Sequence, residues 1–243
     1  MFRHGLPAWR YMPKDAIPRA LNWKPFLLFA AFSCTGAVAQ PAQPLDNGWW
    51  QIVPGERVGR ITRSTSEEQI IEIFGAENVR RADVGVGEGE SIPGTIVYPN
   101  DPTKRLAILW KDEAQRKTPS EVRIRGRSSL WRTNTGFSLG STLRQIEKLN
   151  GKPFILTGFA WDYSGTIVDC NQGRLKDLGC IDPQDPSKQI QGRKILLRLM
   201  PDEATHATRE YRAILGDRYF SSGHPAMQKL NPRVYEMIVF FVP

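Results

Sequence analysis

Two short helical segments, each followed by strand-forming sequence, occur in the same order in the two halves of the chain. Residues 66–75 and 141–151 both begin at a Ser/Thr position suited to an N-cap and end at a glycine. Aligned on that glycine, the two segments share a glutamine and an isoleucine at the same positions. The sequence Gly-Thr-Ile-Val then follows each helix, at 94–97 and at 165–168. These matches predict two similar units, each a helix followed by strands.

Strand-forming runs, separated by turn residues, fill most of the remaining sequence. They lie at 95–98, 106–110, 122–126, 154–161, 166–170, 194–200 and 235–242. A hairpin connection is expected at 162–165, and one longer helix is expected at 202–215. Strands grouped in runs with few helices favour an α+β fold, with an antiparallel sheet and short helices packed on one face.

The expected organisation has four parts. Residues 1–39 form a secretory signal peptide, and residues 40–47 are a polar, proline-containing linker. Residues 48–135 form the first α+β unit. Residues 136–243 form the second unit, which also holds the cysteine loop and the C-terminal helix and strand.

The signal peptide is predicted from the apolar run at 26–39, which is shorter than the roughly 20 residues that cross a bilayer. Lys24 precedes the run, and small residues end it at Ala39, directly before Gln40. A basic residue, a short apolar core and small residues at the cleavage site are typical of exported proteins. We therefore expect cleavage between Ala39 and Gln40, a periplasmic or secreted protein, and no transmembrane segment in the mature chain. Met12 is an alternative start that leaves a leader of ordinary length.

Two other readings of this segment are a buried N-terminal helix and a lipoprotein signal at Cys34. The lipoprotein motif fits poorly, because the bulky Phe32 stands where a small residue is expected.

The basic charge of the chain does not predict a nucleic-acid partner. The formal net charge is +8, and residues 1–39 supply half of it, with five Lys/Arg and one Asp. The remaining charges are interspersed and do not form the clustered stripe that nucleic acid requires. One local cluster stands out, because Arg123, Arg125 and Arg127 would share one face of a strand. Either this face is solvated, or it binds an anionic ligand or partner.

The cysteines agree with export. Cys34 leaves with the leader, and Cys170 and Cys180 remain as a pair expected to form one disulfide. So short a loop implies about 2–3 kcal/mol of stabilisation in the chain-entropy model. The pair has no nearby histidines for zinc and lacks the Cys-x-x-Cys spacing of redox catalysts.

Aromatic side chains beside a carboxylate form the second candidate site. Trp161, Asp162 and Tyr163 follow one predicted strand, and Trp110 and Trp131 are grouped with them. Rings at loop ends suit carbohydrate or peptide binding, since they stack and the acid accepts hydrogen bonds. The alternative is that the tryptophans fill the core and Asp162 makes a local turn bond.

Three further patterns predict no chemistry. Ser222 and His224 are too close in sequence to present catalytic geometry readily. The acidic runs at 87–90 and 182–185 lack the ligand ladder of a calcium loop. The glycine-rich stretch at 84–89 lacks the helix that a dinucleotide site needs. We therefore expect no metal site and no cofactor.

The segments before the two helices carry a family resemblance. Residues 60–65 (Arg-Ile-Thr-Arg-Ser-Thr) and 137–142 (Phe-Ser-Leu-Gly-Ser-Thr) each lead into a short helix that ends in Phe-Gly or Asn-Gly, followed by strands. This arrangement resembles the β-lactamase-inhibitor-protein-like fold, which includes small outer-membrane assembly lipoproteins. The resemblance covers about 60 residues and implies a secreted interaction module with a concave sheet surface; no binding residue carries over. The chain also resembles exported bacterial proteins of unassigned function, which implies no chemistry.

Together these patterns predict a secreted or periplasmic binding module. Its expected partner is an envelope or extracellular protein or polymer, bound through a sheet face and aromatic loop ends. The alternative is an envelope-directed hydrolase that uses Asp162 with Glu88 or Glu90 as paired carboxylates. A structural accessory protein is a third reading.

Overall fold

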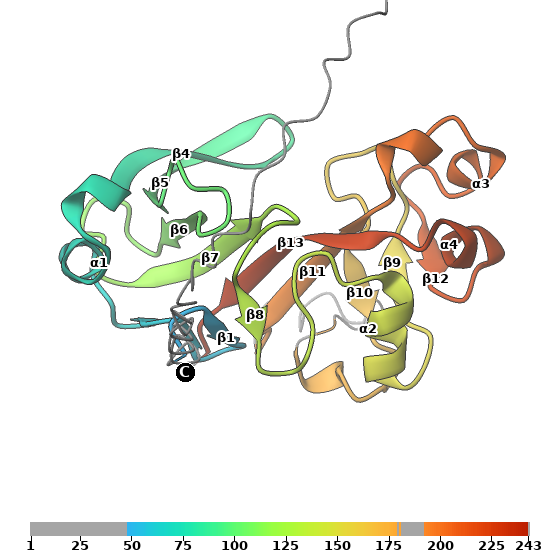
Figure 1. Ribbon diagram of the computed structural model, residues 1–243, viewed down its shortest axis with the longest axis horizontal. Helices are drawn as coiled ribbons and strands as arrows, with labels where there is room; N and C mark the ends of the chain where they lie inside the picture. Colours follow the sequence, from blue (N-terminus) through green and yellow to red (C-terminus); the bar gives the residue numbers. More distant parts are fainter. Residues whose placement is uncertain (1–47, 179, 181–191, 243) are drawn as a thin grey trace, which may run out of the picture. The chain divides into compact units, whose positions relative to one another are not determined.

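The fold is seen in a computed structural model that describes residues 48–178, 180 and 192–242 (Figure 1). These residues belong to one compact unit, Pro44–Pro243. The predicted leader, linker, cleavage site and Cys34 lie outside the described residues, as does the acidic run at 182–185. Among the described helices, none combines the length and the apolar character needed to cross a membrane.

A six-stranded sheet in which all neighbours are antiparallel is the largest element. Its order is β11 (Ile195–Met200), β13 (Arg233–Phe240), β7 (Pro119–Arg125), β6 (Leu106–Trp110), β5 (Glu90–Val97) and β4 (Val79–Gly87). A three-stranded antiparallel sheet has the order β10 (Ile167–Asp169), β9 (Ile155–Thr157) and β12 (Tyr219–Ser221). A small four-stranded sheet has the order β3 (Ile61–Thr62), β2 (Arg57–Val58), β1 (Gln51–Val53) and β8 (Arg132–Thr133).

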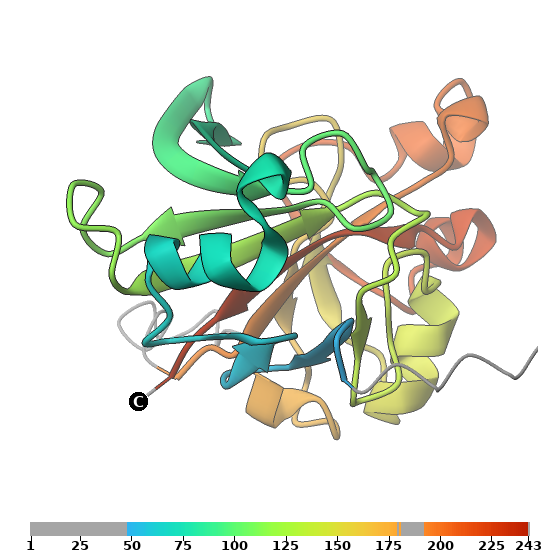
Figure 2. The same ribbon diagram turned by 60° about the vertical axis from the view of Figure 1, so that its left-hand side comes forward.

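The described helices are all short. They are α1 (Glu67–Phe74), α2 (Leu143–Asn150), α3 (Arg209–Arg212) and α4 (Pro225–Leu230), with single 3-10 turns at η1 (Ala76–Asn78), η2 (Lys176–Leu178) and η4 (Glu203–Thr205). In both Figure 1 and Figure 2, α2, α3 and α4 gather at the same end of the sheet. The predicted α+β fold class is confirmed.

One order of elements occurs twice. A helix precedes four strands in the order α1-β4-β5-β6-β7 and again in the order α2-β9-β10-β11-β13, although α3, β12 and α4 lie between β11 and β13 in the second set. Both helices carry the same capping box, formed by Ser66 with Gln69 in α1 and by Thr142 with Gln145 in α2. In the second set, β10 belongs to the three-stranded sheet and β11 to the six-stranded sheet. An antiparallel bridge between Thr166, directly before β10, and Arg198 of β11 connects these two strands.

The repeated Gly-Thr-Ile-Val sequence has a structural reason in both copies, because each glycine lies against the backbone of a neighbouring strand. A Cβ at Gly94 would lie 2.8 Å from the Ile108 carbonyl oxygen. A Cβ at Gly165 would lie 2.0 Å from the Leu199 carbonyl oxygen, and this glycine has a φ of +63°. Only glycine permits such close packing without a shift of the chain.

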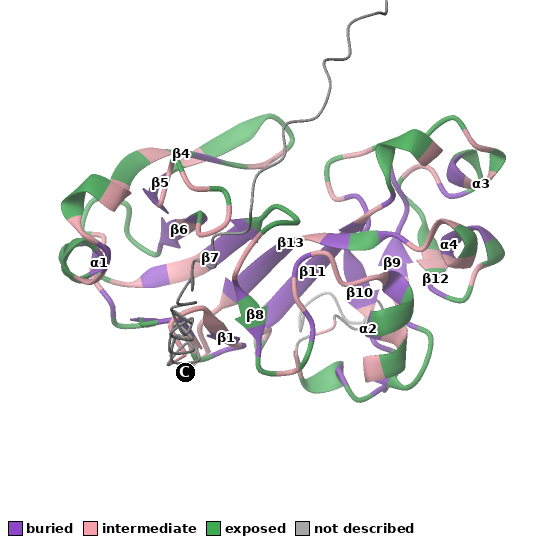
Figure 3. Cartoon of the chain, viewed as in Figure 1, coloured by how far each residue is buried: buried purple, intermediate pink, exposed green. Residues whose placement is uncertain are grey.

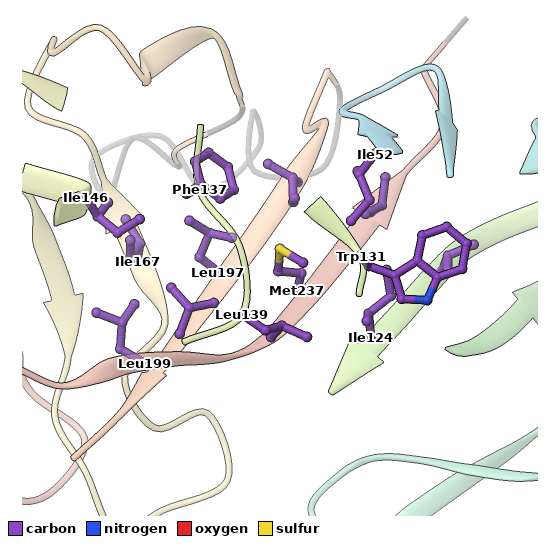
Figure 4. Packing of buried hydrophobic residues seen from close by; sticks show 14 of the residues in the cluster. Ile52, Ile124, Trp131, Phe137, Leu139, Ile146, Ile167, Leu197, Leu199 and Met237 are labelled. Atoms are coloured by element: carbon purple, nitrogen blue, oxygen red, sulfur yellow. The ribbon is translucent and has the colours of Figure 1, made fainter. Parts of the chain in front are cut away.

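The main core lies on the sheet face that the two repeated helices cover. Ile70 of α1 and Ile146 of α2 are both buried in it, together with Trp131 and Met237. Figure 4 shows Trp131 over the strands at one end and Ile146 at the other. Glu67, at the start of α1, is buried at the edge of this core, where it accepts a hydrogen bond from Thr95 at 2.6 Å and pairs with Arg81 and Arg116.

The opposite face of the sheet, here called the outer face, carries a second and smaller cluster. The hairpin of β4 and β5 turns at Glu88 and Gly89, both with positive φ. Val84 of this hairpin packs on Ile96 and Leu109 on the outer face. The tip of the hairpin is exposed (Figure 3).

Two predicted elements differ from the structure. The helix expected at 202–215 is divided into η4 and α3, because Thr208 caps a new helix start through the Tyr211 N–H. The strand expected at 154–161 ends as β9 at Thr157, since the next residues turn aside and Phe159 donates to the Ile214 carbonyl at 3.0 Å. The strand at 106–110 is confirmed with its predicted bounds.

Candidate functional site

Side-chain alternation in β7 places two predicted arginines on the outer face. Val122 and Ile124 are fully buried in the main core, so Arg123 and Arg125 project from the other side. Arg127 lies beyond the end of the strand, where it pairs with Asp202 at the exposed surface. The shared face predicted for three arginines therefore holds for two of them.

A cavity of about 130 Å³ opens beside these arginines on the outer face. It is lined by Asp83, Val84, Gly85, Ile96, Arg105, Leu106, Ala107, Arg123 and Arg125. We call this cavity the arginine cleft. Its wall is β4 of the hairpin, and its floor is formed by β5, β6 and β7.

Arg123 joins the floor of the cleft to its wall. Its side chain is 9% exposed, and its Nε donates to Glu121 at 2.5 Å. Its Nη1 donates to the Gly85 carbonyl oxygen at 3.1 Å, which holds β4 of the hairpin against the sheet. A solvated strand face is thus excluded for Arg123.

Buried charges extend from the cleft along the outer face. Glu236 of β13 is fully buried and accepts hydrogen bonds from Arg125 at 2.6 Å and from Arg198 of β11 at 3.2 Å. The Arg198 side chain is 8% exposed, whereas that of Arg125 is 52% exposed. Among the described residues, nothing accepts from the buried Nε of Arg198. The neighbouring Tyr235 has its pKa raised, mainly because burial disfavours the phenolate.

An aromatic corner, formed by Trp161, Asp162 and Tyr163, lies at the far end of this charge network. The rings of Trp161 and Tyr163 meet edge to face at 5.4 Å, and the Arg198 guanidinium lies 5.3 Å from the Tyr163 ring centre. The corner also touches the hairpin tip, since a Cβ at Gly87 would lie 3.3 Å from the Tyr163 ring.

The charges of two carboxylates act on Tyr163 in this corner. Partial burial raises the pKa of Tyr163, and the charge of Glu88 and, less strongly, that of Asp162 raise it further. Both carboxylates of the hydrolase alternative therefore act on the same tyrosine. Glu90 is exposed on the first residue of β5.

The predicted roles of Trp110 and Trp131 are corrected by the structure. Trp131 is fully buried and donates from Nε1 to the Lys104 carbonyl at 2.9 Å. Trp110 is 5% exposed and donates to Thr95 at 3.0 Å. Both rings lie in the main core, where neither can contact a ligand.

The other sequence candidates have structural roles. Ser222 is fully buried, where it donates to Glu147 at 2.6 Å and accepts from the Phe154 N–H. His224 caps α4 by accepting from the Ala226 N–H at 3.2 Å. Cys170 and Cys180 form the predicted disulfide, with their Cα atoms 5.5 Å apart. Within the described part of the chain, no group of three or more His, Cys, Asp or Glu is placed to hold a metal ion.

Sequence reasoning missed Asp83, Arg105, Arg198 and Glu236. A usable signal was present for the last two. Arg198 interrupts the apolar run Ile195–Met200, and Glu236 interrupts the apolar run at 234–242. Single opposite charges in two buried strands indicate that the strands pair, because a buried charge needs a partner.

Comparison of the chain with protein-family models, curated proteins and solved structures found no match in any of the three.

Proposed function

We propose that this protein is a secreted or periplasmic binding module that recognises an envelope or extracellular protein or polymer through the outer face of its sheet. One observation carries the proposal. The arginine cleft and the aromatic corner lie on the same face, and Glu236 links them by pairing with Arg125 and Arg198. Guanidinium groups and half-exposed aromatic rings are the side chains most enriched at protein recognition sites.

The leader predicted at 1–39 supports the location. The repeated helix-and-strand order is in keeping with the β-lactamase-inhibitor-protein-like resemblance, which implies an interaction module. The aromatic corner suits a partner that offers flat or extended surface, because its two rings are only partly buried.

Capture of a partner tests the proposal. The full chain, exported by a bacterial host and immobilised after purification, is incubated with bacterial envelope extract. We expect a stoichiometric partner that is lost with Trp161→Ala and retained with Tyr219→Ala, since Tyr219 is an exposed ring (63%) outside the cleft and corner. Circular dichroism establishes that both variants are folded. Capture that is equal for both variants, or is absent with the unchanged protein, contradicts the proposal.

The hydrolase alternative has one observation in its favour, which is the position of Glu88 and Asp162 beside Tyr163. Release of soluble fragments from purified envelope polymer, abolished by Glu88→Gln, would support this alternative. Loss of binding with Glu88→Gln, without any fragment release by the unchanged protein, would support the binding module.

A further inference from the structure

We propose that the arginine cleft binds the carboxylate of a ligand that ends in a short apolar group. The inference rests on the proposed function, because it names the chemistry that part of the outer face would recognise. It follows from three properties of the cleft: its donors, its net charge and its walls.

The donors come from three arginines that line one small cavity. Arg123 uses Nε and Nη1 within the protein, and no described residue accepts from its Nη2. Arg105 and Arg125 are exposed at the rim, and the one described acceptor for Arg105 is the Pro99 carbonyl, at 3.3 Å. A guanidinium presents parallel N–H groups that match the two oxygens of a carboxylate.

The charge balance favours a ligand with a single negative charge. The cleft, its ion pairs and the charge that acts on Glu121 comprise five guanidinium groups, from Arg105, Arg123, Arg125, Arg193 and Arg198, and three carboxylates, from Asp83, Glu121 and Glu236. The excess of positive charge attracts an anion, but the three carboxylates oppose a highly charged one. A carboxylate carries one negative charge, whereas a phosphate monoester, with a charge of about −1.5 to −2, meets stronger repulsion from the three carboxylates.

The walls of the cleft determine the rest of the ligand. Val84, Ile96 and Ala107, which belong to the small cluster on the outer face, contribute apolar surface beside the arginines. Ala107 pairs across the sheet with both Arg123 and Ile96, so its methyl group lies on the cleft floor between these two residues. A volume of about 130 Å³ admits only a short side chain.

Titration of the full chain, followed by calorimetry and amide chemical shifts, tests the inference. Two probes represent the two sources of such a group: isovalerate for a free acid and N-acetyl-leucine for the C-terminal residue of a peptide. Isovaleramide has nearly the same shape without the charge, and inorganic phosphate tests the charge argument. We expect at least one acid to bind, and the amide to bind about tenfold or more weakly, because a charge-assisted hydrogen bond contributes about 1.5–3 kcal/mol.

Variants locate the binding. Arg105→Gln removes an exposed donor and is expected to weaken acid binding about tenfold without changing the melting temperature. Ala107→Leu places an isobutyl group on the cleft floor and is expected to abolish binding. Arg63→Gln is the matched control, since Arg63 is exposed in the segment between β3 and α1 and does not line the cleft.

Four results would each overturn the inference. They are no binding of either acid, equal binding of acid and amide, affinity unchanged by both Arg105→Gln and Ala107→Leu, and stronger binding of phosphate than of either acid. The two experiments distinguish failure of this inference from failure of the proposed function. If envelope capture depends on Trp161 but neither acid binds, only the carboxylate inference is refuted. If an acid binds but no partner is captured, the proposed macromolecular partner is refuted.

Discussion

Replacing Glu236 by Gln should destabilise the protein by about 3 kcal/mol or more, because it leaves a buried arginine without its counter-charge. Glu236 is fully buried and is the described carboxylate that accepts from Arg198, whose side chain is only 8% exposed. Glutamine keeps nearly the same shape, so the substitution removes the charge and leaves the packing intact.

The magnitude follows from the unequal exposure of the two partners. Arg125 is 52% exposed, so water replaces most of its interaction with Glu236, and the loss on that side is about 0–1 kcal/mol. Arg198 has no comparable access to water, and breaking a buried pair on one side costs about 3–5 kcal/mol. The amide oxygen of glutamine can still accept one hydrogen bond, which places the expected loss near the lower bound.

Urea unfolding measures this loss. With a slope of about 2 kcal/mol per molar urea, the unfolding midpoint should fall by about 1.5 M. Asp202→Asn is the matched control, because it breaks the Arg127–Asp202 pair, whose side chains are 49% and 51% exposed, and should change stability by less than about 1 kcal/mol. The double replacement Glu236→Leu with Arg198→Met should recover most of the loss. Equal midpoints for Glu236→Gln and Asp202→Asn would refute the reasoning.

Three other outcomes are expected. Trp131→Ala should destabilise the protein by about 3–5 kcal/mol in the same urea assay, since it empties a fully buried site; a folded variant that merely loses ligand binding would contradict the core position. The pKa of Glu67 lies below its usual value of 4.5, because hydrogen bonds and charges from Arg81, Thr95 and Arg116 outweigh the effect of burial, which would raise it. Its contribution to stability is therefore complete above pH 4.5 and is lost as the pH falls through its lower folded pKa, so unfolding curves of Glu67→Gln should depend less on pH below 4.5 than those of the unchanged protein. Alkylation of protein produced in an oxidising compartment should modify Cys170 and Cys180 only after reduction, and reduction should lower stability by about 2–3 kcal/mol; free thiols at Cys170 before reduction would contradict the disulfide.

The helices α1 and α2 could be predicted from sequence because their signals are local, whereas α4 was not predicted. A capping residue, a glutamine three residues later and a terminal glycine fix the ends of α1 and α2 within about one turn. The bounds of the strand at 106–110 could also be predicted, because the segment is apolar and polar residues lie on both sides of it. The edge strand β4 was missed, because charged residues and glycines replace the expected alternation along Val79–Gly87.

The site was predicted only in part, because it depends on strands that are far apart in the sequence. Arg125 and Glu236 are separated by 111 positions and become neighbours only through the pairing of β7 with β13. The positions of the tryptophans could not be predicted for a similar reason. Composition cannot say which face of a strand meets the helices, so Trp110 and Trp131 were grouped with Trp161 although they lie in the core.

The position of the last strand has a consequence for how the chain is made. β13 lies between β7 and β11, so the two sets of strands that follow α1 and α2 are joined in one sheet by a strand that is synthesised after both of its neighbours. Until residues 233–240 are available, β7 has an open edge and Arg198 lacks Glu236. A nascent chain stopped before this strand should therefore remain sensitive to protease, and a chain that includes the strand should become resistant in a single step.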